Sequence, residues 1–426
     1  MDLSRGLPKY EREDIRGLID LTLFQFLVRH PAMQNLNQVK QLGGAYFYYP
    51  NAVHTRLGHA YGTLYGTLKR ALWLFSIGKL TWDEVLALCV AALVHDIGHG
   101  PFSHLVELQR GNHEAWGIQI VRNELVEIIE EIGAPIQIVL DILHRTSPLS
   151  SLIFGTIDGT DKIDYLYRDP LFVFRQTVSY DALLATNVHF ERDVGLYVLP
   201  SGYQIALDAT FRYWSLYSDV YEHPETRVHQ RYWQELLRQM TELDDIVRQQ
   251  FESGGEDGVV GAINYWSHNN GDHPCTERFQ KARQSVHPKA TLVYSPYPNA
   301  TMLNNERGLA KLPCDASLLV KSDKWSVKKL AILEKRLARM LNLAHNQVSI
   351  TPPPPERRWK VPTTKVECGK GNIVSIGQHF PDLISASQMS MQMARNLIVS
   401  VDEPERIRVA TDPGAHQAIL ELLMKG

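Results

Sequence analysis

Apolar residues recur at helical spacing through most of the first 250 positions, and short Gly and Pro breaks separate the stretches. Two long examples run over 114–132 and 232–251. A continuous apolar run, 85–94, follows Thr81 and Glu84, whose spacing is that of a capping box. This pattern predicts a buried helix that begins just after Thr81, within a helical domain that extends to about residue 250.

Three segments break the helical spacing and favour short strands. They are the Tyr-rich segment 45–49 and the alternating segments 195–199 and 203–207. The last two are joined through Pro200-Ser201-Gly202, which suggests a hairpin.

The chain becomes polar and rich in Gly and Asn after residue 250. We expect an irregular connector over 251–298 and a small α+β region over 299–426, after a helical domain over 1–250. In the C-terminal region a helix is predicted over 328–341, with Leu330, Leu333, Leu337 and Met340 along one stripe. Strand-like segments at 372–376 and 405–410 precede a final helix near 413–424. The predicted fold class is mainly α.

Composition places the chain among ordinary soluble globular proteins, with 44% hydrophobic and 21% charged residues in 426 positions. No apolar stretch approaches membrane-spanning length, and the first residues lack the apolar segment of a signal peptide. We therefore expect a cytoplasmic protein with no membrane partner. A net charge of −3 creates no overall field for nucleic acid, so an anionic ligand must be held by local positive charge. The four cysteines show no zinc or disulfide spacing.

His95 and Asp96 end the predicted buried helix, and they are the most informative pair in the chain. A buried carboxylate without a partner is costly, and a cation is the simplest partner for this pair. An ordinary hydrogen-bonded core pair is the alternative. Histidines gather in this part of the chain, which favours the metal; they are His54, His59, His95, His99, His104 and His113.

Two further clusters add chemistry to this pair. Arg56 lies between His54 and His59 and could bind phosphate oxygens. The alternative is that these residues are solvated at a junction between a loop and a helix. Asp161, Tyr165 and Asp169 recur every four residues and share one helical face, which a solvated helix would also explain.

Four side chains from these clusters could together hold one divalent cation, namely His59, His95, Asp96 and Asp161. Mixed nitrogen and oxygen ligands suit Fe, Mn, Mg, Ni or Zn, so the donor set leaves the metal open. Such an ion lowers the pKa of bound water and polarises a phosphoryl oxygen. Hydrolysis at phosphorus is the expected chemistry.

The order His, His-Asp, Asp resembles the HD-domain phosphohydrolase superfamily. Within it, four segments closely resemble the deoxynucleoside triphosphate triphosphohydrolases: Val39-Lys40-Gln41-Leu42-Gly43-Gly44, His54-Thr55-Arg56-Leu57-Gly58-His59, the run from His95 to His104, and the run from Asp161 to Asp169. The resemblance covers about 15–170 and continues more weakly to about 240. It implies a helical HD-domain core.

The resemblance also implies roles for individual residues. His59, His95, Asp96 and Asp161 would hold the metal, and Arg56 and Lys162 would face the substrate phosphates. The catalytic group would be His99, His104, His113 and Glu114, with His104 as the proton donor to the departing nucleoside oxygen. The contacts on the sugar side would come from Gln41, Leu42, Tyr165 and Asp169.

The implied reaction is metal-dependent hydrolysis of a deoxynucleoside triphosphate. Activated water attacks the α-phosphorus and releases the deoxynucleoside and inorganic triphosphate, with additional Mg accompanying the nucleotide. Leu42, packed where a 2′-hydroxyl would lie, would favour deoxyribose because that hydroxyl would be buried without a partner. The chain departs from the family pattern at Glu107, where Asp is expected, and at Pro170–Arg175, which replaces a Gly-containing loop.

Two alternatives stay open. One is an HD-type phosphatase or phosphodiesterase that acts on nucleoside monophosphates, cyclic nucleotides or nucleic-acid ends. The other is a nucleotide-sensing or nucleic-acid-binding regulatory protein, favoured by 321–339, where seven Lys and Arg face only Asp323 and Glu334. The resemblance also predicts a homo-oligomer with a nucleotide activator.

Overall fold

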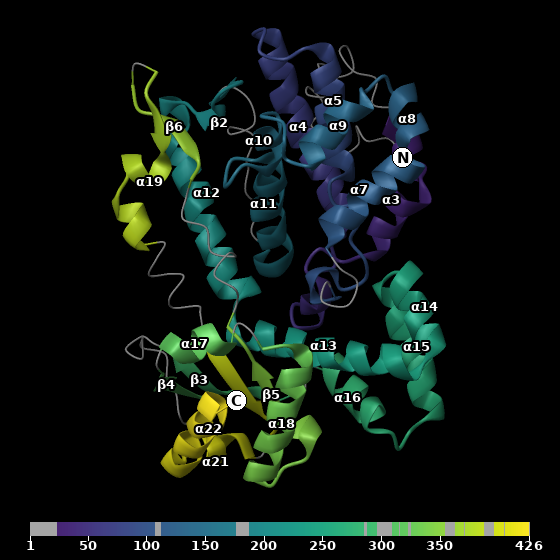
Figure 1. The fold of residues 1–426 in the computed structure, drawn as a ribbon, viewed down its shortest axis with the longest axis vertical. Helices are drawn as coiled ribbons and strands as arrows, with labels where there is room; N and C mark the ends of the chain where they lie inside the picture. The colour runs from purple at the N-terminus through teal and green to yellow at the C-terminus, as the bar shows by residue number, and fades with distance from the viewer. Residues whose placement is uncertain are drawn as a thin grey trace.

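The computed structural model describes residues 24–106, 112–175, 187–284, 288–295, 309–314, 316–322, 325–353, 363–369, 371–386, 396–403 and 405–425. Over these residues the chain is mostly helical and carries two four-stranded sheets. The N-terminal helices form one end of the molecule, and the second sheet with its covering helices forms the other (Figure 1). The prediction of a mainly α fold with a small α+β C-terminal region is confirmed.

Three helices form the centre of the N-terminal core: α4 (Arg56–Ser76), α5 (Trp82–Val94) and α11 (Thr160–Phe174). Helix α5 is buried at every position from Glu84 to Val94 and packs against α4. It begins with the predicted capping box, in which Thr81 Oγ1 accepts from the Glu84 amide and Glu84 Oε2 accepts from the Thr81 amide. The apolar run therefore forms the helix that its sequence predicts.

Shorter elements surround these three helices. They are α2 (Gln25–Arg29), α3 (Pro31–Asn35), η3 (Leu36–Gln38), η4 (Gly43–Phe47), η5 (Ser103–Val106), α7 (His113–Glu124), α8 (Val126–Glu131), α9 (Ile136–Leu143), α10 (Ser150–Phe154), η7 (Pro200–Gly202), α12 (Tyr203–Leu216) and the π-helical turn η8 (Tyr217–Tyr221). The predicted strand at 45–49 is wrong, because most of this Tyr-rich segment belongs to the 3₁₀ helix η4.

The first sheet has the order β1-β2-β6-β7, with β1 (Val188–Glu191), β2 (Gly195–Val198), β6 (Lys365–Glu367) and β7 (Ile373–Ser375). The hairpin predicted through 200–202 is wrong. Strand β2 pairs with the preceding β1, and 203–207 begins the helix α12. Ala206, Ala209 and Tyr213 turn toward the core at helical spacing, and their burial decides the structure of this segment.

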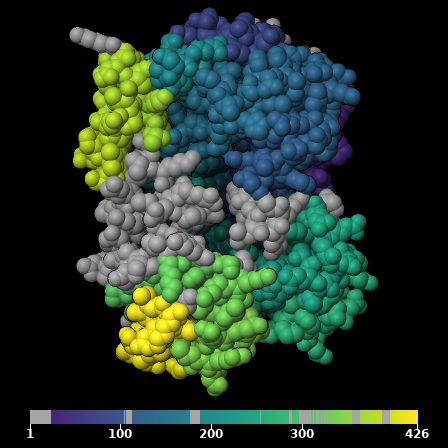
Figure 2. Space-filling view, viewed as in Figure 1, coloured from purple at the N-terminus to yellow at the C-terminus, as the bar shows by residue number. Residues whose placement is uncertain are grey.

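The expected irregular connector, 251–298, is largely ordered helix. Helix α13 (Pro224–Leu243) is followed by α14 (Asp245–Ser253), α15 (Glu256–Asn269) and α16 (Pro274–Arg283). Apolar side chains of α13–α16 form their own cluster with Phe102 of the N-terminal core. The division into domains at 250 and 298 stays a prediction, although these helices join both ends of the molecule (Figures 1 and 2).

The second sheet has the order β4-β3-β8-β5, with β3 (Lys289–Ser295), β4 (Ala310–Pro313), β5 (Val348–Thr351) and β8 (Leu397–Val401). Helix α13 covers one face through Val228, and four helices cover the other. These are α17 (Ala316–Ser322), α18 (Val327–Leu341), α21 (Glu405–Thr411) and α22 (Pro413–Lys425); η10 (His345–Gln347) and α19 (Ile376–His379) complete the described elements.

Two predictions for this region need correction. The segment 405–410 is helical in α21 rather than a strand, because Val409 and Ala410 pack beside α22 onto the sheet. On α18, Leu330, Leu333 and Leu337 are buried as predicted, but Met340 is exposed and Leu341 takes its place in the core. All four cysteines are free thiols. Among the described helices, none has the length and hydrophobicity needed to cross a bilayer.

Candidate metal centre

The four predicted ligands meet between α4, the C-terminal end of α5 and the first turn of α11. Nε2 of His59 lies 3.3 Å from Asp161 Oδ1 and 3.8 Å from Asp96 Oδ2. Nε2 of His95 lies 3.5 Å from Asp96 Oδ1 and 3.8 Å from Asp161 Oδ1. Two imidazole nitrogens and two carboxylates, from three segments distant in sequence, therefore lie close together, with His59, His95 and Asp96 spaced as metal ligands.

Backbone and side-chain hydrogen bonds aim both imidazoles at this point. Nδ1 of His95 donates to the carbonyl oxygen of Ala92 at 2.8 Å, which leaves Nε2 as the nitrogen with a lone pair. That Nε2 atom is buried and has no hydrogen-bond partner. A buried nitrogen without a partner, facing two carboxylates, fits a divalent cation. His59, His95, Asp96 and Asp161 are the residues that would hold it.

Asp164 orients the imidazole of His59. The sequence motifs assigned no role to this residue. Its Oδ2 accepts from Nδ1 of His59 at 2.7 Å, while both carboxylate oxygens accept from the Arg168 guanidinium at 2.7 Å. A carboxylate behind a metal-binding imidazole fixes its tautomer and raises its basicity. The spacing Asp161-x-x-Asp164 on one helix was the available signal, since residues three apart face the same side.

Gly62 provides the room that this arrangement needs. A β-carbon at Gly62 would lie 1.7 Å from Asp164 Oδ1 and 2.2 Å from an Arg168 nitrogen. Helix α4 therefore needs glycine one turn after His59, where the Asp164–Arg168 pair crosses it.

The buried charges of the centre shift one another's pKa values. Burial lowers the pKa of His59, but its hydrogen bonds to Asp161 and Asp164 outweigh this effect and raise it to about 10. Burial raises the pKa of Asp96, yet the nearby His95, Arg56 and His99 hold it well below its usual range. The cluster thus favours ionised carboxylates, the form in which they bind metals.

Both predicted phosphate-binding cations lie beside the ligands. Arg56 donates to Asp96 Oδ2 at 2.6 Å, and Nζ of Lys162 lies 3.7 Å from Asp161 Oδ2. The Arg56 guanidinium also donates to Ser103 Oγ at 3.2 Å and to the Gln41 carbonyl oxygen at 3.3 Å. Arg56 is therefore held on three sides at the edge of the centre.

The predicted catalytic group is only partly assembled. His99 stacks on His113 with ring centroids 3.8 Å apart, and its Nε2 lies 3.5 Å from Asp96 Oδ1. Asp96, His99 and His113 also form a second set of side chains with the spacing of metal ligands. Glu114 is exposed and pairs with Arg145 at 2.6 Å. The side chain of His104 and all of Glu107 lie outside the described residues.

The predicted sugar-side residues are Gln41, Leu42, Tyr165 and Asp169, and the Gln41 carbonyl oxygen accepts from Arg56. Gln41 is buried, and its Oε1 atom has no hydrogen-bond partner, while Leu42 packs against the core. Tyr165 lies with its ring centroid 6.4 Å from that of His59. Asp169 is buried and accepts from His54 Nε2 at 2.8 Å and from the Tyr221 hydroxyl. The contact with Tyr221 was not predicted.

Comparisons with known proteins agree with this geometry. Residues 64–150, which include His95 and Asp96 but neither His59 nor Asp161, match the HD domain family. This segment of the chain is therefore similar to HD domains. Proteins of known structure share its fold: a phosphohydrolase from Bacteroides thetaiotaomicron matches with a TM-score of 0.66 at 18% identity, covering 90% of this chain and 97% of that one. A hypothetical protein from Aquifex aeolicus matches with a TM-score of 0.64 at 20% identity, covering 91% and 95%.

Sequence relatives match more locally. The uncharacterized protein YwfO of Bacillus subtilis is 31% identical over 50% of this chain and 51% of its own length. The deoxynucleoside triphosphate triphosphohydrolase SAMHD1 of Gallus gallus is 34% identical over 30% of this chain and 24% of its own length. The chain thus spans about half or less of the curated relatives that it matches.

Proposed function

We propose that this HD-domain protein hydrolyses deoxynucleoside triphosphates to deoxynucleosides and inorganic triphosphate. The observation that carries the proposal is the position of Arg56 and Lys162, each within ion-pair distance of a carboxylate of the candidate metal centre. The local likeness to SAMHD1 of Gallus gallus supports a nucleotide triphosphate as substrate. When bound, a divalent metal supplies Lewis-acid activation of water and of a phosphoryl oxygen.

The two cations would bind the phosphate chain. The Arg56 guanidinium can release Asp96 to a metal and turn its donors toward phosphate oxygens in a forked contact. The flexible Lys162 ammonium complements it as a point charge. Together they would neutralise the negative charge of the triphosphate chain and hold the α-phosphorus in place for attack by water.

The residues on the sugar side would select the substrate. The unpartnered Oε1 of Gln41 can accept a hydrogen bond from a sugar hydroxyl. Leu42 offers an apolar surface that would leave a 2′-hydroxyl without a partner, and Tyr165 would pack against the sugar. Asp169, already held by His54 and Tyr221, keeps lone pairs for a further donor.

Proton transfer is assigned to histidines of the catalytic group. We assign protonation of the departing 5′-oxygen to His104, and a supporting role to His113, on which His99 stacks. Glu114, in its ion pair with Arg145, would act from the rim of the site.

Product analysis tests this proposal. Purified protein is incubated with each dNTP and NTP in the presence of Mn²⁺ or Mg²⁺, and the products are separated by chromatography. Equal amounts of deoxynucleoside and inorganic triphosphate are expected. Orthophosphate would instead support an HD-type phosphatase or phosphodiesterase, since the same centre suits other phosphate esters.

The regulatory alternative draws support from α18. Lys328, Lys335, Arg336 and Arg339 are exposed, and Glu334 on the same helix turns inward to Arg231. Nucleotide binding without turnover of any substrate would favour this alternative. We also propose that the protein assembles into a homo-oligomer with a nucleotide activator. A sedimentation coefficient that corresponds to the 48.5 kDa monomer, with and without nucleotide, would exclude it.

A further inference from the structure

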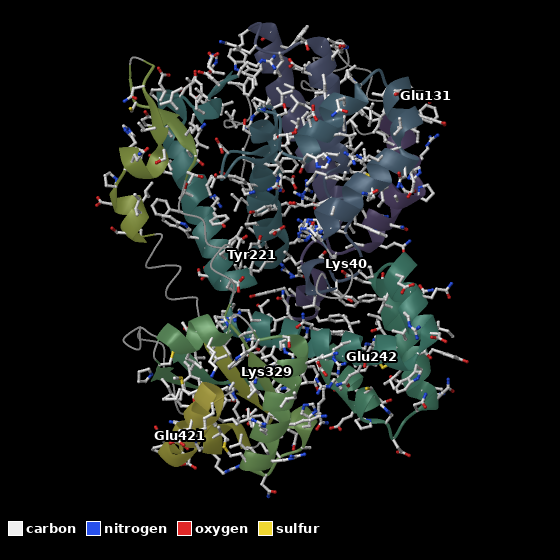
Figure 3. The ribbon with its side chains drawn as sticks, in the orientation of Figure 1. Lys40, Glu131, Tyr221, Glu242, Lys329 and Glu421 are labelled. Carbon is white, nitrogen blue, oxygen red and sulfur yellow. The ribbon has the colours of Figure 1, made fainter. Side chains whose placement is uncertain are left out.

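Glu256 connects the helices α14–α16 to the segments that flank the metal centre. It is the first residue of α15 and is fully buried. Its Oε1 accepts from the backbone amide of Phe102 at 2.9 Å and from the backbone amide of Lys40 at 3.2 Å. Lys40 lies where the N-terminal core meets α13–α16 (Figure 3). One carboxylate oxygen therefore joins two segments that are far apart in sequence.

The same two segments hold Arg56. Ser103, next to Phe102, accepts from Arg56 Nε at 3.2 Å and donates to the Lys40 carbonyl oxygen at 3.2 Å. Gln41, next to Lys40, provides the carbonyl that accepts from the Arg56 guanidinium. Apart from Asp96, the Arg56 guanidinium donates to Ser103 and Gln41. Each of these two residues follows directly after a residue whose backbone amide donates to Glu256.

The turn that Glu256 holds is strained. Phe102 and Ser103 both have positive φ angles, of 62° and 49°, which residues other than glycine rarely adopt. Such a backbone conformation persists only where its surroundings hold it. Facing this turn, a β-carbon on Gly43 would lie 2.7 Å from the Phe102 carbonyl oxygen, so the two segments are in close contact.

Close packing also fixes the beginning of α15. A β-carbon on Gly255 would lie 2.2 Å from the β-carbon of Gln38, so the helix can begin here only with glycine before Glu256. Burial raises the pKa of Glu256 to about 8, so its neutral form is available near neutral pH. Glutamine is therefore a close replacement for it in shape and charge.

We propose that Glu256 is a positioning residue, which holds the turn at Phe102–Ser103 against Lys40–Gln41 and so aims Arg56 at the phosphates of the substrate. The assignment of Arg56 to the phosphates rests on the proposed function. Through Glu256, the helices α14–α16 set the binding of the phosphate chain while leaving His59, His95 and Asp161 untouched. Movement of this helical unit would then change substrate affinity much more than metal affinity, which Arg56 touches only through its hydrogen bond to Asp96.

The test compares Glu256→Ala with Glu256→Gln in the full-length protein, with Asp257→Asn as the matched control. Asp257 is the exposed neighbour of Glu256 on the same helix and lies 3.9 Å from Lys40 Nζ. Three quantities are measured: hydrogen exchange of the amides of Lys40 and Phe102, affinity for Mn²⁺ alone, and affinity of the Mn²⁺-loaded protein for inorganic triphosphate.

For Glu256→Ala we expect exchange of both amides to rise at least about tenfold and triphosphate affinity to fall about tenfold, with Mn²⁺ affinity changed by less than about threefold. Glu256→Gln should restore both quantities to within about threefold of the wild type, and Asp257→Asn should change neither. A purely structural role would lower Mn²⁺ and triphosphate affinity together, and this result would overturn the proposal. Unchanged exchange in Glu256→Ala would overturn it as well.

Failure of the proposed function gives a different result. If the wild-type protein binds no triphosphate, Arg56 is not a phosphate ligand and the proposed function is wrong, and with it the positioning role of Glu256. Hydrogen exchange then still decides whether Glu256 holds the two segments together.

Discussion

The N-terminal core and the C-terminal sheet bury very different side chains. Helices α4 and α11 bury charged groups throughout, including Arg56, His59, Arg70 and Asp164. The core between the C-terminal sheet and its helices is built from apolar residues such as Leu333, Leu337 and Val399. Buried charges add little net stability, whereas apolar packing adds much. The N-terminal region therefore combines a large apolar core with buried charges at the candidate metal centre, whereas the C-terminal region is held mainly by apolar packing.

The largest expected effect comes from removing two ligands of the metal centre. The double variant His95→Ala, Asp96→Ala should lose bound metal and all measurable turnover, because the centre then keeps only one nitrogen and one carboxylate donor. Metal content of the purified protein and product chromatography measure this. Circular dichroism should show that the helices persist, and turnover at the wild-type rate would refute the centre.

In the C-terminal region the expected effect is on stability. Leu337→Ala removes a fully buried side chain of α18 and should lower the free energy of unfolding by about 2–5 kcal/mol. Denaturant titration measures this, and Ile332→Ala, at a half-exposed position of the same helix, is the control. Metal affinity should be the same in both variants; a loss in Leu337→Ala alone would remove the contrast between the two regions.

Replacing Asp164 tests how the core uses its buried charges. Asp164→Asn should weaken metal affinity about 10- to 100-fold, since the amide holds His59 less firmly in the required tautomer. Isothermal titration with Mn²⁺ measures this. The control is Asp208→Asn, because Asp208 also pairs with an arginine four residues later, but among the described residues it has no hydrogen bond or ion pair with a histidine. Equal affinities in both variants would show that Asp164 acts only in packing.

A further expected effect is a pH dependence of stability. Burial raises the pKa of Glu256 from 4.5 to about 8, so the folded protein keeps a proton that the unfolded chain releases between these values. The free energy of unfolding should therefore fall as pH rises from about 5 to about 8. Denaturant titrations across this range should show a steeper fall in the wild type than in Glu256→Gln. Parallel curves would contradict the shift.

Much of the fold could be predicted where local pattern and final burial agree. The helix after Thr81 has a capping box and an apolar run, and both signals lead to the observed α5. Where the two disagree, prediction fails: 203–207 alternates like a strand, yet packing of Ala206 and Tyr213 makes it helical. The helices within 256–283 were missed because Gly and Asn residues obscure their periodicity.

The candidate site was predictable in its ligands but not in their support. His59, His95, Asp96 and Asp161 belong to motifs whose composition indicates metal binding, and the structure brings them together. Asp164 was visible in one of these motifs but had no assigned role. Glu256 had no local signal at all, because its partners are backbone amides of segments 154 and 216 residues away.

The sequence by itself determined which residues are candidates for binding a metal and phosphate, because donor type and helical spacing are properties of the chain. Only the tertiary structure decided how these side chains are held: which carboxylate orients His59, which residues fix Arg56, and how α14–α16 reach the centre. The physical reason is that hydrogen bonds and burial depend on distances in space, and segments far apart along the chain meet only when the whole core is packed.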